Sequence, residues 1–294
     1  MTVPDVEATA DAFGALADPV RVEILAALWE AEGSAVQYSS LLEAVGVQDS
    51  GRFNYHLSKL TDHHFVAKTD DGYRLRPAGL LVVNAVYSGS YVEAPVREGL
   101  DVGGACPSCD GPLVGEYDEG MFRVLCGDCG DQVFMLSFPP RGVETRVDDD
   151  DALLQAVSVH ARAHTRRANR GLCPFCGGAM TGSLDLDADT ALPVSMLVRR
   201  DCDNCGVANR SSIGYAVLEH PAVAGFLAEQ GLPVDAPPWR FDWCLSNDTV
   251  TVASRDSPRV TVDATVEGAE TALRVTVDER GRVAGTERLP AEDL

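Results

Sequence analysis

The stretch Cys106-Pro107-Ser108-Cys109, followed after sixteen residues by Cys126-Gly127-Asp128-Cys129, decides the fold of the middle of this chain. Two residues between thiolates let one tight turn present both sulfurs to a single tetrahedral ion, and two such turns complete a four-cysteine site. Apolar runs at 113–114 and 121–125 flank a turn, so we expect a hairpin between the pairs, with 133–138 as a third strand. This spacing predicts a zinc ribbon over residues 105–140.

The same plan recurs further along, in Cys173-Pro174-Phe175-Cys176 and Cys202-Asp203-Asn204-Cys205. The spacer is 25 residues here, longer than the usual range of about 15–20, and 185–190 is the expected extra loop. We interpret the two modules as a duplicated unit, the second over residues 171–217. A helix over 148–168 is expected to connect them.

Eight of the nine cysteines fall into these four pairs, which indicates metal binding and not a disulfide framework. We expect two zinc ions, one per four-cysteine site, with the ligands Cys106, Cys109, Cys126, Cys129, Cys173, Cys176, Cys202 and Cys205. Closed four-thiolate sites stabilise folds and have no open position for catalysis. Iron in a rubredoxin-like site uses the same turns, so zinc and iron stay open. A redox Cys-x-x-Cys is the other alternative, but such motifs occur as single pairs. The ninth cysteine, Cys244, is expected to be a small buried residue outside the metal sites.

The charge is strongly acidic, with 24 basic against 45 acidic residues and a formal net charge of −21. Only two of the cations are lysines. This bias suggests a protein kept soluble in molar salt, from a halophilic archaeon, although an acidic protein from ordinary salt is an alternative. An acidic total normally argues against nucleic acid, but in molar salt the Debye length is about 3 Å and local chemistry decides.

No apolar run is long enough to span a membrane, and residues 1–7 lack the pattern of a signal peptide. We therefore expect a cytoplasmic protein with no membrane partner. Neither a phosphate-binding loop, nor paired catalytic carboxylates, nor a Ser/Cys–His arrangement is recognisable, so we expect no enzyme.

Residues 9–88 show the pattern helix, helix, helix, hairpin, helix. Apolar residues recur at helical spacing in the first stretch, at Phe13, Leu16, Val20, Ile24, Leu25 and Leu28. Asp18-Pro19 suits a break or restart of that helix. Ser39 is expected to cap a short helix that Gly46 ends, and a third helix covers about 49–62. Strands at 65–69 and 73–76 flank an Asp-Gly turn, and an apolar helix follows at 80–87.

The third helix divides its residues between two faces. Phe53, Leu57 and Leu60 are expected to face the core, and no acidic residue lies between positions 50 and 61. The polar residues that point away are Arg52, Asn54, Tyr55, Ser58 and Lys59. Arg and Asn side chains can form paired hydrogen bonds with guanine and adenine, while Tyr, Ser and Lys suit phosphates. A merely solvated polar face is the alternative.

Three stretches in this region resemble the ArsR-type winged-helix regulators: 16–25, 53–60 and 72–79. The resemblance implies a winged helix-turn-helix over residues 1–90, binding to double-stranded DNA, a homodimer and a pseudo-palindromic operator. Because Asp70 and Asp71 at the wing tip would repel the DNA backbone, Lys68, Arg74 and Arg76 are the expected wing contacts. ArsR metal sensors carry cysteines in this domain, but residues 1–105 contain none, so metal sensing there is not supported.

The final segment, 218–294, is predicted to hold a short helix near 221–230 and an antiparallel β-meander from the alternating runs at 249–252, 259–262 and 273–277. The expected fold class is α+β. The stretch 160–170 is the most basic in the chain, which suits either a phosphate contact or the end of a helix dipole.

The function expected from these features is a DNA-binding transcriptional regulator with structural zinc sites. The alternative is a zinc-dependent protein–protein docking module of the transcription machinery without sequence-specific DNA binding. The target promoter, the effector, activation versus repression and the role of the C-terminal β-rich region stay open.

Overall fold

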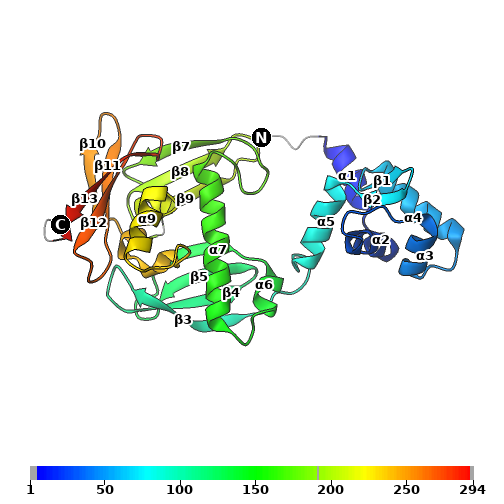
Figure 1. The fold of residues 1–294 in the computed structure, drawn as a ribbon, viewed down its shortest axis with the longest axis horizontal. Coiled ribbons are helices and arrows are strands. Elements are labelled where there is room, and N and C mark those ends of the chain that lie inside the picture. Colours follow the sequence, from blue (N-terminus) through cyan, green and yellow to red (C-terminus); the bar gives the residue numbers. More distant parts are fainter. Residues whose placement is uncertain (1–4, 191, 292–294) are drawn as a thin grey trace. The chain divides into compact units, whose positions relative to one another are not determined.

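The computed structural model describes residues 5–190 and 192–291 and is α+β, as expected. Expectations that involve residues 1–4 or 292–294, including the ends of the first and last predicted segments, lie outside the described residues. The chain forms two compact units, an N-terminal unit that ends at Glu93 and a C-terminal unit from Ala94 onward (Figure 1). Each unit is described by itself.

Within its described residues the N-terminal unit holds five helices and one hairpin, in the order α1 (Val6–Gly14), α2 (Pro19–Glu30), α3 (Tyr38–Val45), α4 (Ser50–Asp62), β1 (Val66–Thr69), β2 (Gly72–Leu75) and α5 (Pro77–Tyr87). The Asp18 carboxylate accepts the Val20 amide and caps α2, so the Asp-Pro pair separates α1 from α2. Gly46, with φ of 71°, ends α3. Asp49 then caps α4 by accepting two amide hydrogen bonds.

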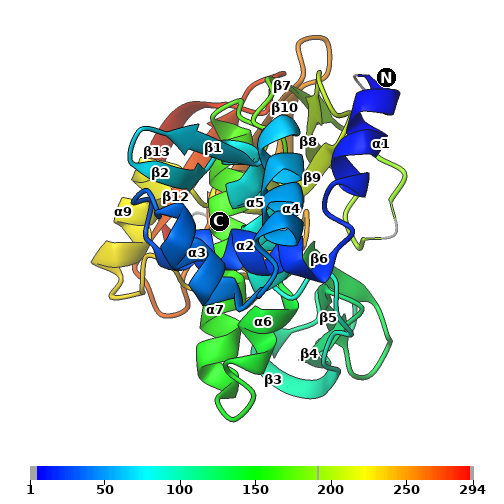
Figure 2. The same cartoon turned by 90° about the vertical axis from the view of Figure 1, so that its right-hand side faces the viewer.

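Helix α2 is the centre of the N-terminal unit, because it contacts α3, α4, α5 and β2 (Figure 2). Its buried Ile24, Leu25 and Leu28 pack with Phe53 and Leu57 of α4. The same face of α4 buries a histidine, His56, which sequence spacing alone had not assigned to the core. Its Nδ1 lies 3.6 Å from Oδ1 of Asp18, the residue that caps α2.

Two details of this unit differ from the sequence expectation. Phe13 belongs to the apolar residues at helical spacing, but it is 67% exposed, and α1 has no fully buried residue. Helix α3 begins at Tyr38 with Gln37 as its N-cap, two residues earlier than the expected Ser39 cap would place it.

The C-terminal unit begins with a four-stranded antiparallel sheet in the order β3 (Arg97–Ala105), β4 (Pro112–Asp118), β5 (Met121–Cys126) and β6 (Gln132–Ser137). The expected hairpin and third strand correspond to β4, β5 and β6. Strand β3 was not expected, because the zinc ribbon was predicted to begin at residue 105 and no strand was predicted immediately before it. Two irregularities in its pairing with β4 let a glycine-rich segment continue as a strand.

Two helices follow, α6 (Pro140–Glu144) and α7 (Asp150–Asn169). Helix α7 buries Leu153, Val157 and Ala161 against the first sheet. It continues toward a second antiparallel sheet, β7 (Met180–Asp185), β8 (Leu197–Cys202) and β9 (Ala208–Ser212), as Figure 1 shows. Helix α7 thus spans from one cysteine-bearing sheet to the other.

Short helical elements then lead to the last sheet: α8 (Ile213–Val217), α9 (Pro221–Glu229), η1 (Pro238–Arg240) and α10 (Asp242–Leu245). The expected meander is present as β10 (Val250–Ser254), β11 (Arg259–Ala264) and β12 (Thr271–Val277), and a fourth strand, β13 (Val283–Pro290), completes it. Alternate residues of β11 and β12 are buried against β8, α8 and α9. This packing makes the β-rich segment part of the C-terminal unit.

None of the helices in the described part of the chain is long and apolar enough to cross a bilayer.

Candidate metal centres and the exposed face of helix α4

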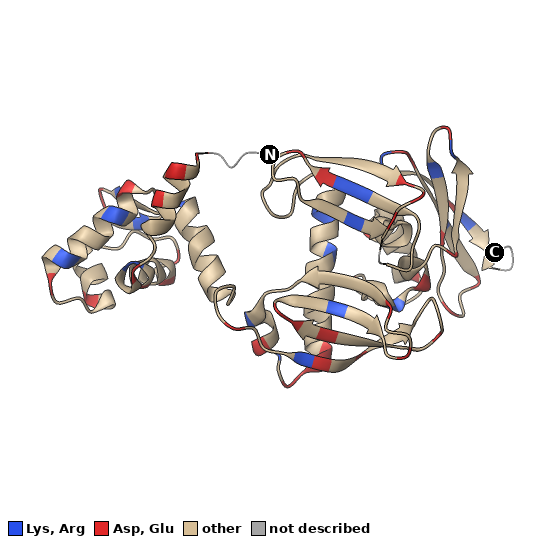
Figure 3. Cartoon of the chain, turned by 180° about the vertical axis from the view of Figure 1, so that it is seen from behind, with Lys and Arg blue, Asp and Glu red and all other residues tan. Residues whose placement is uncertain are grey.

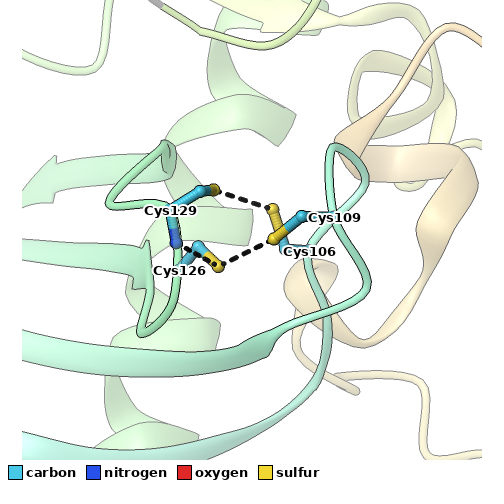
Figure 4. A group of neighbouring side chains, drawn as sticks. All are labelled: Cys106, Cys109, Cys126 and Cys129. Atoms are coloured by element: carbon cyan, nitrogen blue, oxygen red, sulfur yellow. Dashed lines mark hydrogen bonds between the residues drawn. The ribbon is translucent and has the colours of Figure 1, made fainter.

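The first cysteine cluster forms where two tight turns of the first sheet meet (Figure 4). Cys106 follows β3, and Cys126 is the last residue of β5, so the sheet brings the two pairs together. All four sulfurs lie within 4.8 Å of one another. The Sγ–Sγ distances are 3.7 Å for Cys106–Cys129 and 3.5 Å for Cys109–Cys126.

The second cluster reproduces this geometry on the second sheet. Its Sγ–Sγ distances are again 3.7 Å, for Cys173–Cys205, and 3.5 Å, for Cys176–Cys202. The backbone also matches, since the amides of Cys106 and Cys173 donate to the carbonyls five residues later, Gly111 and Gly178. The repeat of both sulfur and backbone geometry supports the interpretation of the modules as a duplicated unit.

These distances test whether the residues fit a metal. A tetrahedral zinc with bonds of about 2.3 Å to sulfur places its ligands about 3.8 Å apart, close to the separations found here. A disulfide needs about 2.05 Å, so none of the pairs is oxidised. The described residues therefore form two four-thiolate clusters able to hold a metal ion, at the eight cysteines named from the sequence.

In each cluster, hydrogen bonds stabilise the thiolate form of one cysteine. In the first, Cys126 Sγ accepts the amides of Cys129 and Asp128 at 3.4 Å. These two amides, chiefly the amide of Cys129, lower the pKa of the Cys126 thiol to about 6. In the second, the Asn204 side-chain amide donates to Cys176 Sγ at 3.5 Å, and this bond is the main cause that lowers the Cys176 pKa to about 6. Asn204 was missed from the sequence, because a residue between two ligands carries no signal of its own.

Cys244 stands outside both clusters. It is 3% exposed and packs in the core of the C-terminal unit, where burial raises its pKa well above the usual value. This environment matches the small buried residue expected from the sequence.

The exposed face of α4 is the second candidate site. Arg52, Asn54 and Tyr55 are exposed, and Ser58 and Lys59 are half-buried, while the opposite face is in the core. Lys59 Nζ lies 5.9 Å from the centre of the Tyr55 ring. The charge colouring of Figure 3 shows cations on α4 with acidic residues kept to its end. The five polar residues named from the sequence thus share one accessible surface.

The three cations expected on the hairpin do not share one face. Lys68 pairs with Tyr73 and Arg74 with Ala67, so Lys68 and Arg74 lie on opposite faces of the β1–β2 ribbon. Arg76 follows β2 and is the N-cap of α5. All three cations are exposed, and within the described residues neither they nor the cations of α4 form an ion pair.

The basic end of α7 contains two partly buried histidines. The rings of His160 and His164 lie 4.4 Å apart between Phe138 and Phe175. Burial lowers both histidine pKa values, and the positive charges of His160 and Arg167 help to lower that of His164 to about 4. These two side chains are packing groups at neutral pH and do not add to the positive charge of the helix.

Comparison with protein families finds two matches. Residues 9–86 match a family described as "Domain of unknown function (DUF7347)". Residues 103–283, more than half of the chain, match one described as "Domain of unknown function (DUF7351)". Comparisons with curated proteins and with solved structures found no match. The second match spans both cysteine clusters and most of the last sheet, and the chain therefore belongs to the family described as "Domain of unknown function (DUF7351)".

Proposed function

We propose that this protein is a DNA-binding transcriptional regulator, in which a winged helix-turn-helix contacts promoter DNA and two four-cysteine zinc sites stabilise the C-terminal unit. The observation that carries the proposal is the α4 surface, where Arg52, Asn54 and Tyr55 are exposed without an acidic residue between positions 50 and 61. The resemblance to ArsR-type regulators points the same way.

The order of elements supports a winged helix. Helices α3 and α4 are joined by a short turn, and the β1–β2 hairpin follows α4 directly. In helix-turn-helix proteins the second of these helices enters the major groove, where the polar residues of its exposed face meet base edges. Arg52 and Asn54 would supply base contacts, and Tyr55, Ser58 and Lys59 would contact phosphates.

The acidic total does not oppose this assignment if the protein works in molar salt. Screening over about 3 Å leaves contacts at hydrogen-bond range as the main electrostatic terms. Five cations of the N-terminal unit, Arg52, Lys59, Lys68, Arg74 and Arg76, are without an ion pair among the described residues and so are available to phosphates. The opposed faces of Lys68 and Arg74 imply that only one of them contacts DNA along with α4.

The metal sites act structurally in this proposal. Four thiolates fill a tetrahedral shell and leave no position for substrate, so no catalytic role follows from them. Zinc is the proposed ion in both sites, and iron is separated from it by the visible absorption of a ferric tetrathiolate.

A homodimer is part of the proposal. Phe13 is 67% exposed and Leu81 of α5 is 70% exposed, so the first and last helices of the N-terminal unit carry apolar side chains outside its core. A dimer through these helices would bind two half-sites of a pseudo-palindrome. Light scattering on the full chain, with Leu81→Ser as the weakened variant, tests this part separately.

The test of DNA binding compares two matched double variants by fluorescence anisotropy on the protein's own upstream DNA in molar KCl. Arg52→Ala/Tyr55→Ala removes two side chains of the α4 surface, whereas Arg280→Ala/Tyr91→Ala removes the same residue types at exposed positions elsewhere. The base contact of Arg52 is worth about 1–3 kcal/mol and the loss of the Tyr55 phosphate contact adds to it, so the first variant should bind at least about tenfold more weakly. The control should bind as the wild type does. Equal affinities for all three proteins would refute the assignment of α4.

A docking module of the transcription machinery is the second candidate. It is favoured by exposed Asp70 and Asp71 at the tip of the hairpin, which would repel phosphates. This candidate predicts a stable protein complex that survives the α4 substitutions, together with no affinity for any genomic fragment.

A further inference from the structure

The C-terminal unit contains a cavity lined by an unusual concentration of positive charge. Its volume is about 350 Å³, and its walls come from the end of α7, from β8, from the start of α9 and from the β12–β13 turn. Three arginines, Arg170, Arg200 and Arg282, line it together with His220. In a protein with a net charge of −21, this convergence of guanidinium groups needs a physical reason.

Of the three arginines, Arg200 is the buried one. It lies on β8, is 5% exposed, and its Nη2 donates to the Gly281 carbonyl at 2.8 Å. Its Nη1 is buried without a hydrogen-bond partner among the described residues. Arg282 lines the same cavity. A buried cation beside another cation is costly unless an anion joins them.

The acidic groups nearby do not supply that anion. Glu219 lines the cavity but pairs with Arg162, whose side chain is 6% exposed. Asp278 forms no ion pair among the described residues, and its Oδ1 accepts the amides of Arg280 and Arg282. Among the described residues, none of the three cavity arginines forms an ion pair. The cavity therefore keeps a surplus of positive charge.

The other lining groups supply hydrogen-bonding atoms and an apolar wall. His220 Nδ1 accepts the Ala222 amide, so its neutral form carries the proton on Nε2 and can donate from there. His220 also caps α9, whose positive dipole end meets the cavity. Pro221 and Val283 are apolar lining residues. Asn169 Oδ1 is buried without a partner and can accept a hydroxyl.

We propose that this cavity is a binding site for a small organic phosphate, with the guanidinium groups of Arg170, Arg200 and Arg282 around the phosphate and the apolar wall against its organic part. Arginine suits this role because its planar donors match the oxygens of a phosphate in pairs. The volume falls in the range of about 300–1,000 Å³ found for small-molecule sites. A site of this kind is independent of DNA binding by the N-terminal unit.

Calorimetric titration of the metal-loaded full chain tests the site, with phenyl phosphate, inorganic phosphate and benzoate as probes. Molar KCl suppresses attraction beyond about 3 Å, so binding that persists reports contacts inside a built site. We expect saturable one-site binding of phenyl phosphate, weaker binding of inorganic phosphate and weaker binding still of benzoate. Binding of benzoate as tight as that of phenyl phosphate would overturn the assignment to phosphate.

Arg170→Gln/Arg282→Gln removes two exposed arginines of the cavity, and Arg166→Gln/Arg280→Gln removes two exposed arginines close by in sequence that do not line it. The cavity variant should raise the Kd for phenyl phosphate about tenfold or more, and the control should change it less than about twofold. If the double variant does not fold, Arg282→Gln alone takes its place. Absence of saturable binding to the wild type, or equal weakening in both variants, overturns the proposal.

Discussion

Replacement of Cys126 by serine isolates the contribution of one ligand to one metal centre. Cys126 is 3% exposed, ends β5, and lies 3.5 Å from the sulfur of Cys109. A serine hydroxyl keeps the size and a hydrogen-bonding group but is not a zinc ligand of comparable strength. Structural zinc contributes about 10–16 kcal/mol through four thiolates, so an equal share per ligand is about 3 kcal/mol. The first centre should then bind zinc about a hundredfold more weakly.

The second centre should be unaffected, because its ligands come from a different sheet. Native mass spectrometry of the full chain during titration with a chelator measures both centres at once. We expect the wild type to hold two ions and Cys126→Ser to lose one of them at a much lower chelator concentration. Cys244→Ser is the matched control, since Cys244 is also 3% exposed but lies outside the clusters.

Two outcomes would refute this account of the centres. The first is that Cys126→Ser retains both ions with wild-type affinity. The second is that Cys244→Ser loses an ion, which would mean that loss follows from disturbed packing and not from loss of a ligand.

Three further perturbations have defined outcomes. Burial lowers the pKa of His164 to about 4, whereas a histidine of an unfolded chain has a pKa of about 6.5, so the unfolded state binds more protons as the pH falls. The free energy of unfolding should therefore fall by about 1 kcal/mol from pH 7.5 to 5.5. Urea unfolding should show that His164→Gln loses this pH dependence and that the variant of an exposed histidine, His64→Gln, keeps it. Phe53→Ala should lower the free energy of unfolding of the N-terminal unit by about 3–5 kcal/mol, because Phe53 is fully buried, whereas Phe13→Ala should lower it by less than about 1 kcal/mol. Similar unfolding midpoints for the two variants would contradict the described packing. Removal of metal by excess chelator at neutral pH should lower the thermal midpoint of the C-terminal unit and zinc should restore it, and an unchanged midpoint would count against a structural role.

The cysteine clusters were predictable because the chemistry is local. Two residues between thiolates determine the turn, and the turn determines where the sulfurs point, so all eight expected ligands meet in two groups. The two faces of α4 were predictable for a similar reason, since helical spacing alone separates Phe53 and Leu57 from Arg52 and Asn54.

Strand β3 could not be predicted, because its pairing depends on contacts distant in sequence. The stretch is rich in glycine, which by composition alone is typical of a linker. Gly99, Gly103 and Gly104 all have positive φ in the structure. In the structure a side chain at Gly104 would come within 2.8 Å of the Trp239 carbonyl, so this glycine is required by close packing of β3 on η1.

The cationic cavity is also invisible in the sequence. Arg170, Arg200 and Arg282 are separated by tens of residues and come together only when the β12–β13 turn packs against β8. The basic stretch 160–170 had been noted, but its histidines are neutral packing groups, and only its last two residues, Asn169 and Arg170, line the cavity.

The measurement that tests the central claim most directly is the ratio of affinities of the wild-type, zinc-loaded chain for its own upstream DNA and for a shuffled duplex of equal length and composition. Both are measured by fluorescence anisotropy at the same molar KCl concentration, because affinities for DNA depend steeply on salt. Direct contacts from α4 to bases predict a preference of about a thousandfold or more for the native sequence. Equal affinities for the two duplexes, or no binding to either, would contradict a sequence-specific regulator.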